Sequence, residues 1–383
     1  MRLPLFYLSL LFAFTNTYSQ NQIHNFKEKF ELPEKVKETS GLLFLDGKII
    51  THNDSGDAAN LYEIDSLSGT IVRTVSISNA TNVDWEDLAE NDTHIFIADI
   101  GNNNGNREDL KIYTILKSDF KENNTVSAET ISFSYEDQTV FSSQANSSNF
   151  DAEGIVIYGN QILIFTKNWA DLKTNVYKIP LTPGSHVASK ISSGDIKGLI
   201  TSATYTEDRF FLTGYDTSLT PFLIYISYNR MPGENIFFSG FTKISLKDKI
   251  GQGSQIEAIT NISNTGKYYI SRENFSTTIS GTTFTFKQKL YEFYDETSGL
   301  LSISENKLTL INISPNPATH KIKIKTSLPF STIEIYNSFG KKVHTLIIPN
   351  EKEIDISFLS KGVYYLKIHL KDNKSIVRKI VKL

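Results

Sequence analysis

The stretch Asp84-Trp-Glu-Asp-Leu-Ala-Glu90 has related copies elsewhere in the chain, at residues 39–45 (TSGLLFL), 151–157 (DAEGIVI), 201–207 (TSATYTE) and 255–261 (QIEAITN). In each copy a serine or glutamate is followed by a small or acidic residue and then by an apolar residue or threonine. We call these serines and glutamates the strand-start residues, and they are Ser40, Glu86, Glu153, Ser202 and Glu257. A motif that recurs at intervals of tens of residues indicates a repeat architecture.

Two further segments with strand character follow each copy. The second segments are KIITHND (48–54), HIFIADI (94–100), QILIFTK (161–167), RFFLTGY (209–215) and KYYISRE (267–273). The third segments contain tyrosine and are NLYEID (60–65), LKIYTI (110–115), NVYKIP (175–180), FLIYIS (222–227) and KLYEFY (289–294). Candidate fourth strands, such as residues 70–77 and 130–135, complete four antiparallel strands per unit, which is the pattern of a propeller blade. Residues 26–32 are expected to supply the outer strand of the fifth unit and close the ring.

We therefore predict an all-β fold in which residues 22–305 form a five-bladed β-propeller, with six blades as the alternative, followed by a small Ig-like β-sandwich. The abundance of Tyr, Phe, Thr and Ile agrees with a chain made mostly of strands. The formal net charge is only −3 and the basic residues are scattered among acids, which argues against a nucleic-acid partner. The sequence contains no cysteine, so stability must come from burial rather than from disulfides, and a bound metal could add to it.

The innermost strands of a propeller all start on one face, so the strand-start residues are expected to converge on the axis. Three carboxylates and two hydroxyls would meet there, and like charges so close together would oppose folding unless a cation neutralised them. Oxygen ligands without His or Cys suit Ca²⁺. We predict an axial calcium ion held by all five residues, with Asp84 and Asp151 beside Glu86 and Glu153. The alternative is that these positions are polar only because they begin strands beside a solvated channel.

These residues resemble a known family. Ser40-Gly-Leu-Leu-Phe-Leu, Glu86-Asp-Leu-Ala, Glu153-Gly-Ile-Val, Ser202-Ala-Thr and Glu257-Ala-Ile are similar to the axial strand starts of calcium-dependent apyrases. The resemblance implies a five-bladed propeller whose axial calcium is held by serine and glutamate side chains. No stretch matches the nucleotide-contacting residues of that family, and the Glu-Gly strand starts also resemble phytase-like and other secreted propellers. A shared fold does not confer a shared reaction.

The loops between the second and third strands should open on the same face as the strand-start residues. Their candidate ligand-binding residues are His52, Asp99, Arg107, Lys167, Trp169, Asp216 and Arg272. Asp54 or Glu273 could act as a general base that activates a water beside the metal. For each of these positions the alternative is an ordinary solvated loop residue. The loop DIGNNNGNR at residues 99–107 could likewise wrap calcium or form a plain turn.

The first residues have the layout of a cleavable export signal. Arg2 precedes an apolar run, Leu3 to Phe14, and Thr17 and Ser19 suit the −3 and −1 positions of a cleavage before Gln20. Residues 1–19 are therefore expected to be removed. A retained membrane anchor is the alternative, but the apolar run is shorter than the roughly 20 residues that a span needs.

The last residues form short alternating strands with lysine-rich faces. SPNPA (314–318), IYNSFGKKV (335–343), ISFLSKGVYYLKI (356–368) and VRKIVK (377–382) resemble, in order, the type A C-terminal sorting domain of the type IX secretion system. We expect this domain at residues 308–383, with residues 306–318 as the linker and its start. The resemblance implies passage through the type IX machinery to a secreted or cell-surface location. An Ig-like adhesion module is the alternative.

Two functions fit these expectations. The first is a secreted propeller, stabilised by calcium, that binds an extracellular ligand without catalysis. The alternative is a calcium-dependent phosphohydrolase, either an apyrase-like nucleoside diphosphatase or another phosphoesterase. No GxSxG, HExxH, Walker loop or paired CxxC motif is present to favour another enzyme class. No membrane span and no nucleic-acid partner are expected.

Overall fold

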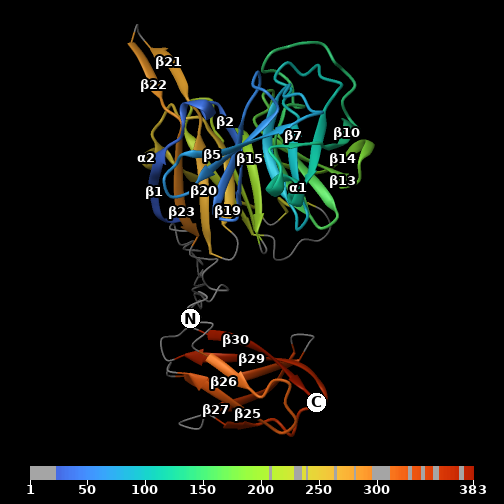
Figure 1. Ribbon diagram of the computed structural model, residues 1–383, viewed down its shortest axis with the longest axis vertical. Coiled ribbons are helices and arrows are strands. Elements are labelled where there is room, and N and C mark those ends of the chain that lie inside the picture. The colour runs from blue at the N-terminus through green and yellow to red at the C-terminus, as the bar shows by residue number, and fades with distance from the viewer. Residues whose placement is uncertain are drawn as a thin grey trace, which may run out of the picture. The chain divides into compact units, whose positions relative to one another are not determined.

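In a computed structural model the chain forms two compact units, one ending at Glu296 and the other beginning at Thr297 (Figure 1). The structure describes residues 23–206, 209–227, 235–238, 240–262, 265–279, 282–295, 311–326, 330–337, 341–347, 353–370 and 375–383. The predicted export signal, residues 1–19, lies outside the described residues, as does the first part of the predicted linker, residues 306–310. Strand accounts for 60% of the structure and helix for 4%, so the all-β prediction is confirmed.

The first unit contains five groups of four hydrogen-bonded strands. The first group is β2 (Thr39–Leu45), β3 (Lys48–Asn53), β4 (Asn60–Asp65) and β5 (Ile71–Ile77). The second is β6 (Trp85–Glu90), β7 (His94–Asp99), β8 (Lys111–Leu116) and β10 (Glu129–Tyr135). The third is β11 (Ala152–Tyr158), β12 (Gln161–Thr166), β13 (Thr174–Pro180) and β14 (Gly184–Gly194). The fourth is β15 (Leu199–Thr206), β16 (Arg209–Tyr215), β17 (Pro221–Ser227) and β18 (Thr242–Ser245).

The fifth group is completed by the start of the unit. It consists of β19 (Ile256–Ile262), β20 (Lys267–Arg272), β23 (Lys289–Asp295) and, as its outer strand, β1 (Ile23–Glu31). β1 pairs antiparallel with β23, and Phe26 lies against the rings of Tyr291 and Phe293. The outer strand that the sequence predicts over residues 26–32 therefore corresponds to β1.

Short elements lie in the segments between these strands. They are the 3-10 helix η1 (Glu34–Val36), the helices α1 (Lys117–Glu122) and α2 (Lys247–Ile250), strand β9 (Thr125–Val126) and the hairpin β21 (Phe275–Ile279) and β22 (Thr282–Phe286). β9 extends the first group through a parallel pairing with β5. A second parallel pairing, between β10 and β14, joins the second and third groups into one sheet of eight strands.

The first strands of the groups pack against one another in the cyclic order β2, β6, β11, β15, β19 and back to β2. Side chains on a strand alternate between two faces, so each of these strands can bury one face against the group before it and one against the group after it. Their burial agrees, because the first five residues of β2, β6, β11, β15 and β19 are all buried. The five groups therefore close into a ring.

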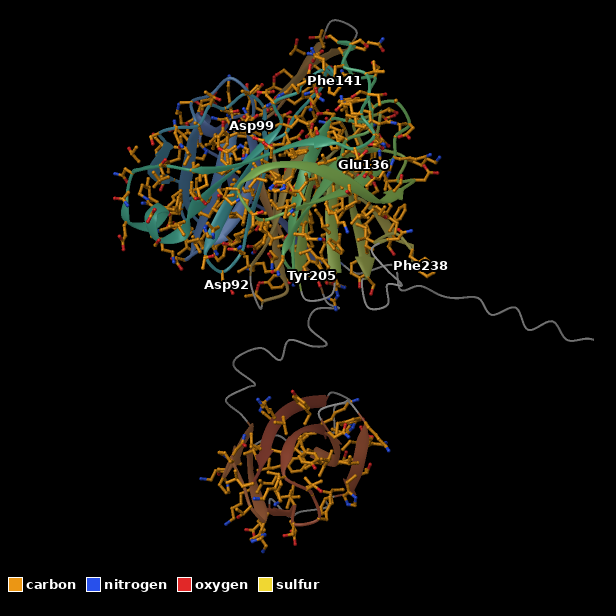
Figure 2. All side chains as sticks on the ribbon, turned by 90° about the vertical axis from the view of Figure 1, so that its right-hand side faces the viewer. Asp92, Asp99, Glu136, Phe141, Tyr205 and Phe238 are labelled. Atoms are coloured by element: carbon orange, nitrogen blue, oxygen red, sulfur yellow. The ribbon has the colours of Figure 1, made fainter. Side chains whose placement is uncertain are left out.

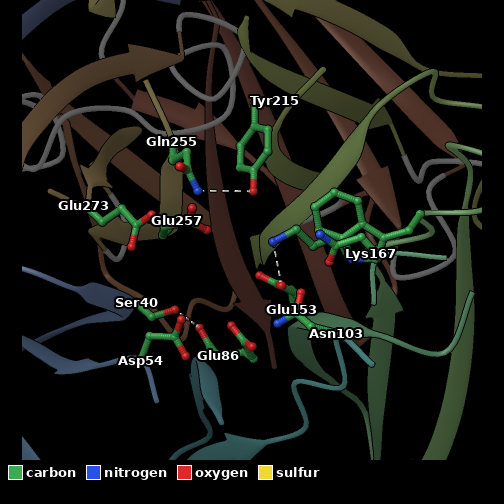
Figure 3. A pocket seen from close by; sticks show the side chains of 12 residues that line it. Ser40, Asp54, Glu86, Asn103, Glu153, Lys167, Tyr215, Gln255, Glu257 and Glu273 are labelled. Carbon is green, nitrogen blue, oxygen red and sulfur yellow. Dashed lines mark hydrogen bonds and ion pairs between the residues drawn. The ribbon is translucent and has the colours of Figure 1, made fainter. Parts of the chain in front are cut away.

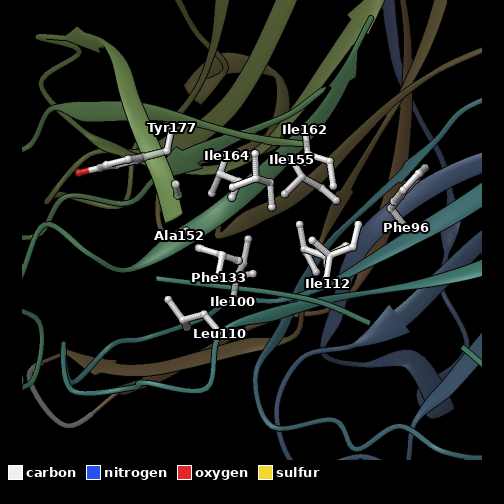
Figure 4. Packing of buried hydrophobic residues seen from close by; sticks show 14 of the residues in the cluster. Phe96, Ile100, Leu110, Ile112, Phe133, Ala152, Ile155, Ile162, Ile164 and Tyr177 are labelled. Atoms are coloured by element: carbon white, nitrogen blue, oxygen red, sulfur yellow. The ribbon is translucent and has the colours of Figure 1, made fainter. Parts of the chain in front are cut away.

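The hydrophobic core is divided into five clusters, one between each pair of neighbouring groups. Between the second and third groups, Phe96, Ile112 and Phe133 meet Ile155 and Ile164 (Figure 4). The corresponding clusters elsewhere are centred on Leu43 with Leu88, Phe165 with Phe210, Phe211 with Tyr268, and Leu42 with Ala258. Each group is thus held by apolar burial on both sides.

The two ends of the ring differ in what they carry. Phe141, in the long loop between β10 and β11, lies at one end of the unit, whereas Asp92 and Tyr205 lie at the opposite end (Figure 2). Asp92 and Tyr205 belong to the segments where β6 and β15 finish, so the starts of the inner strands face the end that carries Phe141. The site described below lies at those strand starts.

The second unit is formed by two antiparallel sheets. One contains β24 (Ile311–Ser314), β25 (Lys321–Thr326) and β28 (Glu353–Asp355), and the other β26 (Phe330–Asn337), β27 (Lys342–Ile347), β29 (Gly362–Leu370) and β30 (Ser375–Lys382). Strict alternation in β25 exposes Lys321 and Lys323 and buries Ile322 and Ile324, which pack with Ile333 in a separate core. The lysine-rich faces noted in the sequence therefore point to solvent.

A matched pair of glycines tests the packing of the inner strands. Gly41 in β2 has φ +38°, and a Cβ there would lie 2.5 Å from His52 Nε2 and 2.8 Å from the backbone nitrogen of Leu88. Gly47 also has a left-handed φ, +79°, but has no atom within 4 Å of a built Cβ. We expect Gly41→Ala to lower the free energy of unfolding by about 3 kcal/mol, from backbone strain and overlap, and Gly47→Ala by about 1 kcal/mol, from strain alone. Chemical denaturation of both variants measures this, and equal losses would contradict the tight contact between β2 and β6.

Candidate functional site

The starts of the inner strands surround a cavity of about 210 Å³ (Figure 3). Four of the five strand-start residues line it, namely Ser40, Glu86, Glu153 and Glu257. The other lining residues are Asp54, Asn103, Asn146, Lys167, Trp169, Tyr215, Gln255 and Glu273. The predicted convergence of the strand-start residues is therefore observed for four of them.

Ser202 does not line the cavity. It is fully buried, and its hydroxyl donates to Asp87 Oδ1 at 3.0 Å and accepts from the backbone nitrogen of Ile259 at 3.2 Å. Asp87 Oδ2 also accepts from the backbone nitrogens of Ile155, at 3.0 Å, and Ala203, at 3.3 Å. The buried carboxylate of Asp87 thus connects β6, β11 and β15. It also binds the hydroxyl of Ser202, which the sequence analysis assigned to the metal.

Carboxylates gather at the cavity in two overlapping groups. Oxygens of Asp54, Asp84 and Glu86 lie within 4.8 Å of one another, and so do oxygens of Glu86, Asp151 and Glu153. Asp54 follows β3, and Asp84 and Asp151 immediately precede β6 and β11. The strand starts therefore bring together acids that lie far apart in the sequence.

Burial and mutual repulsion disfavour the charged forms of these acids. Burial, assisted by neighbouring carboxylates, raises the pKa of Asp84 to about 7 and that of Glu273 to about 8. The same two causes raise the pKa values of Glu86 and Glu257 well above the usual range. Such shifts are typical of a functional site that lacks a compensating charge.

Lys167 is the one basic residue among the described residues that line the cavity. Its Nζ donates to Glu153 Oε1 at 2.7 Å and lies 5.3 Å and 5.4 Å from the ring centres of Trp169 and Tyr215. Burial alone would lower the pKa of Lys167, but Glu153 and the other nearby carboxylates raise it well above its ordinary value. Lys167 therefore remains an ammonium ion.

Asp99 and Arg107 contact each other at the edge of this region. Arg107 Nη2 donates to Asp99 Oδ1 at 2.9 Å, and Arg107 Nη1 donates to the carbonyl of Gly101 at 2.7 Å. Asn102 accepts from the backbone nitrogen of Arg107 at 2.9 Å. These bonds hold loop 99–107 together, so the guanidinium of Arg107 is already used in hydrogen bonds within the protein.

Three other predicted ligand-binding residues also have internal roles. Arg272 is buried and donates to the carbonyl of Lys287 from Nε at 3.0 Å and from Nη2 at 2.8 Å. Asp216 accepts from the backbone nitrogens of Ser218 and Thr220 and so shapes a turn. His52 is fully buried, with Nδ1 2.9 Å from the carbonyl of Asn53 and its ring edge-on to Trp85. The structure does not place these side chains in the cavity lining.

Sequence reasoning missed Asn146 and Gln255 as lining residues, and it included Asn103 only as part of the loop at residues 99–107. Asn146 belongs to the long loop after β10, and its backbone nitrogen donates to the carbonyl of Asn103 at 2.8 Å. Gln255 Nε2 lies 3.4 Å from the hydroxyl of Tyr215. The only signal was position: Gln255 stands two residues before Glu257, on the same side of an extended segment.

Comparison with known proteins identifies the last part of the chain. Residues 312–383 match the family of secretion system C-terminal sorting domains, which confirms the predicted type IX sorting domain. This domain supports a secreted type IX cargo protein, and it implies interaction with the type IX machinery and a secreted or cell-surface location. No curated protein matches the chain.

Solved structures resemble the chain only distantly. The extracellular domain of a proposed one-component system from Bacteroides thetaiotaomicron is 10% identical with a TM-score of 0.29, and the match covers 90% of this chain and 43% of that one. A DUF4623 family protein from Bacteroides eggerthii is 12% identical with a TM-score of 0.37, covering 68% and 71%. Hydrazine synthase of Kuenenia stuttgartiensis is 9% identical with a TM-score of 0.34, covering 90% and 76%.

The chain thus spans less than half of the first of these structures. These TM-scores define neither fold nor activity, and the structures named here do not confirm the resemblance to calcium-dependent apyrases. Within the described residues, no helix is both long enough and apolar enough to cross a membrane.

Burial of His52 predicts a pH dependence of stability. Burial lowers the pKa of His52 to about 4, against about 6.5 in an unfolded chain. Below pH 6.5 the unfolded state takes up a proton that the folded state does not, so this residue should lower stability as the pH falls from 6.5 to 4, by up to about 3 kcal/mol. His52→Gln removes this contribution, and the difference in unfolding free energy between wild type and variant should therefore change across that window and be constant above pH 7. The acids of the cavity titrate in both proteins, so their contributions cancel in this difference. A difference that stays constant from pH 4 to 8 would disprove the predicted contribution of His52.

Proposed function

We propose that this protein is a type IX cargo whose first unit is a five-bladed β-propeller that holds a calcium ion in its axial cavity and binds an extracellular ligand. The cyclic packing of β2, β6, β11, β15 and β19 supports five blades rather than six, because each inner strand has one neighbour on either side and β19 returns to β2. The two sheets of the second unit, which share one apolar core, support the Ig-like sandwich.

The observation that carries the calcium proposal is the imbalance of charge in the cavity. Five carboxyl side chains and one ammonium line it, and the acids are largely buried. Carboxylates are almost never buried unless they are paired or bound to a cation. A divalent cation would supply the missing positive charge.

The donor set fits calcium. Among the described residues that line the cavity there is no histidine, and the available donors are carboxylate, hydroxyl and amide oxygens. Such hard donors suit Ca²⁺, which takes six to eight oxygens and accepts irregular geometry. Ser202 is bound to Asp87 and is therefore not among the ligands that we propose, and the ligands are sought among the acids that surround the cavity.

A phosphohydrolase is the second candidate. Asp54 and Glu273, the predicted general bases, line the same cavity as the proposed ion, which is the observation in its favour. Against it, Arg107 and Arg272 are committed to internal hydrogen bonds, and Lys167 is paired with Glu153. An anionic substrate would therefore depend on the cation for its binding.

Removal of calcium tests the first proposal. A ligand at 100 times its dissociation constant adds about 2.7 kcal/mol to stability. For a unit of this size that corresponds to roughly 5–10 °C, so EGTA should lower the melting temperature of the purified chain by that amount. Glu86→Gln should abolish this response, and it should not destabilise the calcium-free protein, because it removes a repelling charge.

Asp92→Asn, at the opposite end of the unit, serves as the control and should keep the full response (Figure 2). An unchanged melting curve in EGTA would exclude a stabilising calcium ion.

A substrate panel separates the two functions. Nucleoside diphosphates are tested first and other phosphate esters next, with calcium and with EGTA, and released phosphate is measured. The binding function predicts no release above that of the buffer. Calcium-dependent release that falls at least tenfold in Glu273→Gln would establish the hydrolase instead, since loss of a general base costs about 10²–10⁴-fold.

A further inference from the structure

We propose that the cation lies off the axis of the ring, held by Asp54, Asp84 and Glu86, and that the ammonium of Lys167 takes the place of a metal beside Glu153. This inference rests on the proposed calcium site and assigns its ligands. It differs from an axial ion held symmetrically by the strand-start residues. The cavity then has two positive charges, one from the protein and one from the ion.

Glu86 provides the first reason. Its side chain is only 3% exposed and points into the cavity (Figure 3). Within the described part of the chain its carboxylate has neither a hydrogen-bond donor nor an ion-pair partner, since the bond from Ser40 goes to its backbone carbonyl at 2.5 Å. A buried carboxylate without a partner points to an absent cation.

Asp84 and Asp54 complete the group on the same side of the cavity. Their carboxylate oxygens lie within 4.8 Å of one another and of an oxygen of Glu86. The backbone of Asp84 is fixed, because its nitrogen donates to Asp99 Oδ1 at 3.1 Å and its carbonyl accepts from Gly101 at 3.1 Å. A Cβ at Gly101 would overlap the carboxylates of both Asp84 and Glu86, so the glycine leaves room for these two side chains beside each other.

Two other acids beside the cavity, Asp151 and Glu153, already have hydrogen-bond donors. Asp151 accepts from the backbone nitrogen of Asn102 at 2.6 Å and from Trp169 Nε1 at 2.8 Å. Glu153 accepts from Lys167 Nζ at 2.7 Å. These donors satisfy the two carboxylates without a metal.

Lys167 is held firmly in that position. Its side chain is 8% exposed, and its ammonium lies between the rings of Trp169 and Tyr215. Displacing it would leave the buried carboxylate of Glu153 without its partner. An ion on the axis would have to approach this ammonium. Among the described residues, by contrast, no lysine or arginine donates a hydrogen bond to the carboxylate of Asp54, Asp84 or Glu86.

Calcium titration of variants tests the assignment. The purified chain is freed of metal and titrated with CaCl₂ by calorimetry, together with Asp54→Asn, Asp84→Asn, Glu257→Gln and the double variant Glu153→Gln/Lys167→Met. We expect Asp54→Asn and Asp84→Asn each to weaken calcium binding at least tenfold. Glu257→Gln and the charge-neutral double variant should stay within threefold of wild type.

Each other result has a definite meaning. A tenfold loss in the double variant, or in Glu257→Gln, with Asp84→Asn unaffected would establish the axial set and overturn the off-axis assignment. Equal losses in all variants would also overturn it. If wild type itself binds no calcium, the proposed function fails rather than the choice of ligands. Circular dichroism checks folding, and Asp54→Asn, in a different loop, gives the same information if Asp84→Asn does not fold.

Discussion

Repulsion among buried carboxylates at the strand starts is the constraint on which the rest of the first unit depends. The ring brings the ends of five strands to one place, and several of those ends carry acids. Three acids of this region have partners of different kinds. Glu153 has an ammonium, Asp151 has two N–H donors, and Asp87 bridges three strands through backbone nitrogens and a serine. Glu86 has none of these, and it is the residue around which we place the cation.

Much of the fold could be predicted from the sequence, because its signals are local. A repeated order of strand, turn and strand, with tyrosine in the third strand, is visible in each unit and specifies four-stranded groups. The closing strand near residues 26–32 could be predicted since the fifth group otherwise lacked an outer strand. The parallel pairing of β10 with β14 could not, because it depends on a contact between two outer strands from different groups, and no periodicity reports it.

The site was less predictable than the fold. Position in the repeat correctly brought Ser40, Glu86, Glu153 and Glu257 to one cavity. It could not reveal that the hydroxyl of Ser202 is bound to Asp87 and so does not face the cavity. In the sequence, Asp87 resembles any polar residue on the exposed side of a strand. The sequence also indicated too many ligand-binding residues in the loops. Arg107, Asp216 and Arg272 instead form hydrogen bonds with backbone groups of the protein. Hydrogen bonding between distant segments decides whether a charged loop residue is available to a ligand, and a single sequence does not contain that information.

The pairing of β1 with β23 has a consequence for how this cargo reaches its folded state. Lys287 and Glu31, 256 residues apart, form an ion pair across the segments that this pairing joins, so the ring closes through contacts between the start and the end of the unit. Such non-local pairing makes folding slow, because a long loop must close before its contacts stabilise the chain. A chain emerging in order from its synthesis or export apparatus therefore stays open until the residues around 295 are free. Completion of the ring is therefore a late event in folding, because it needs both β1 and β23.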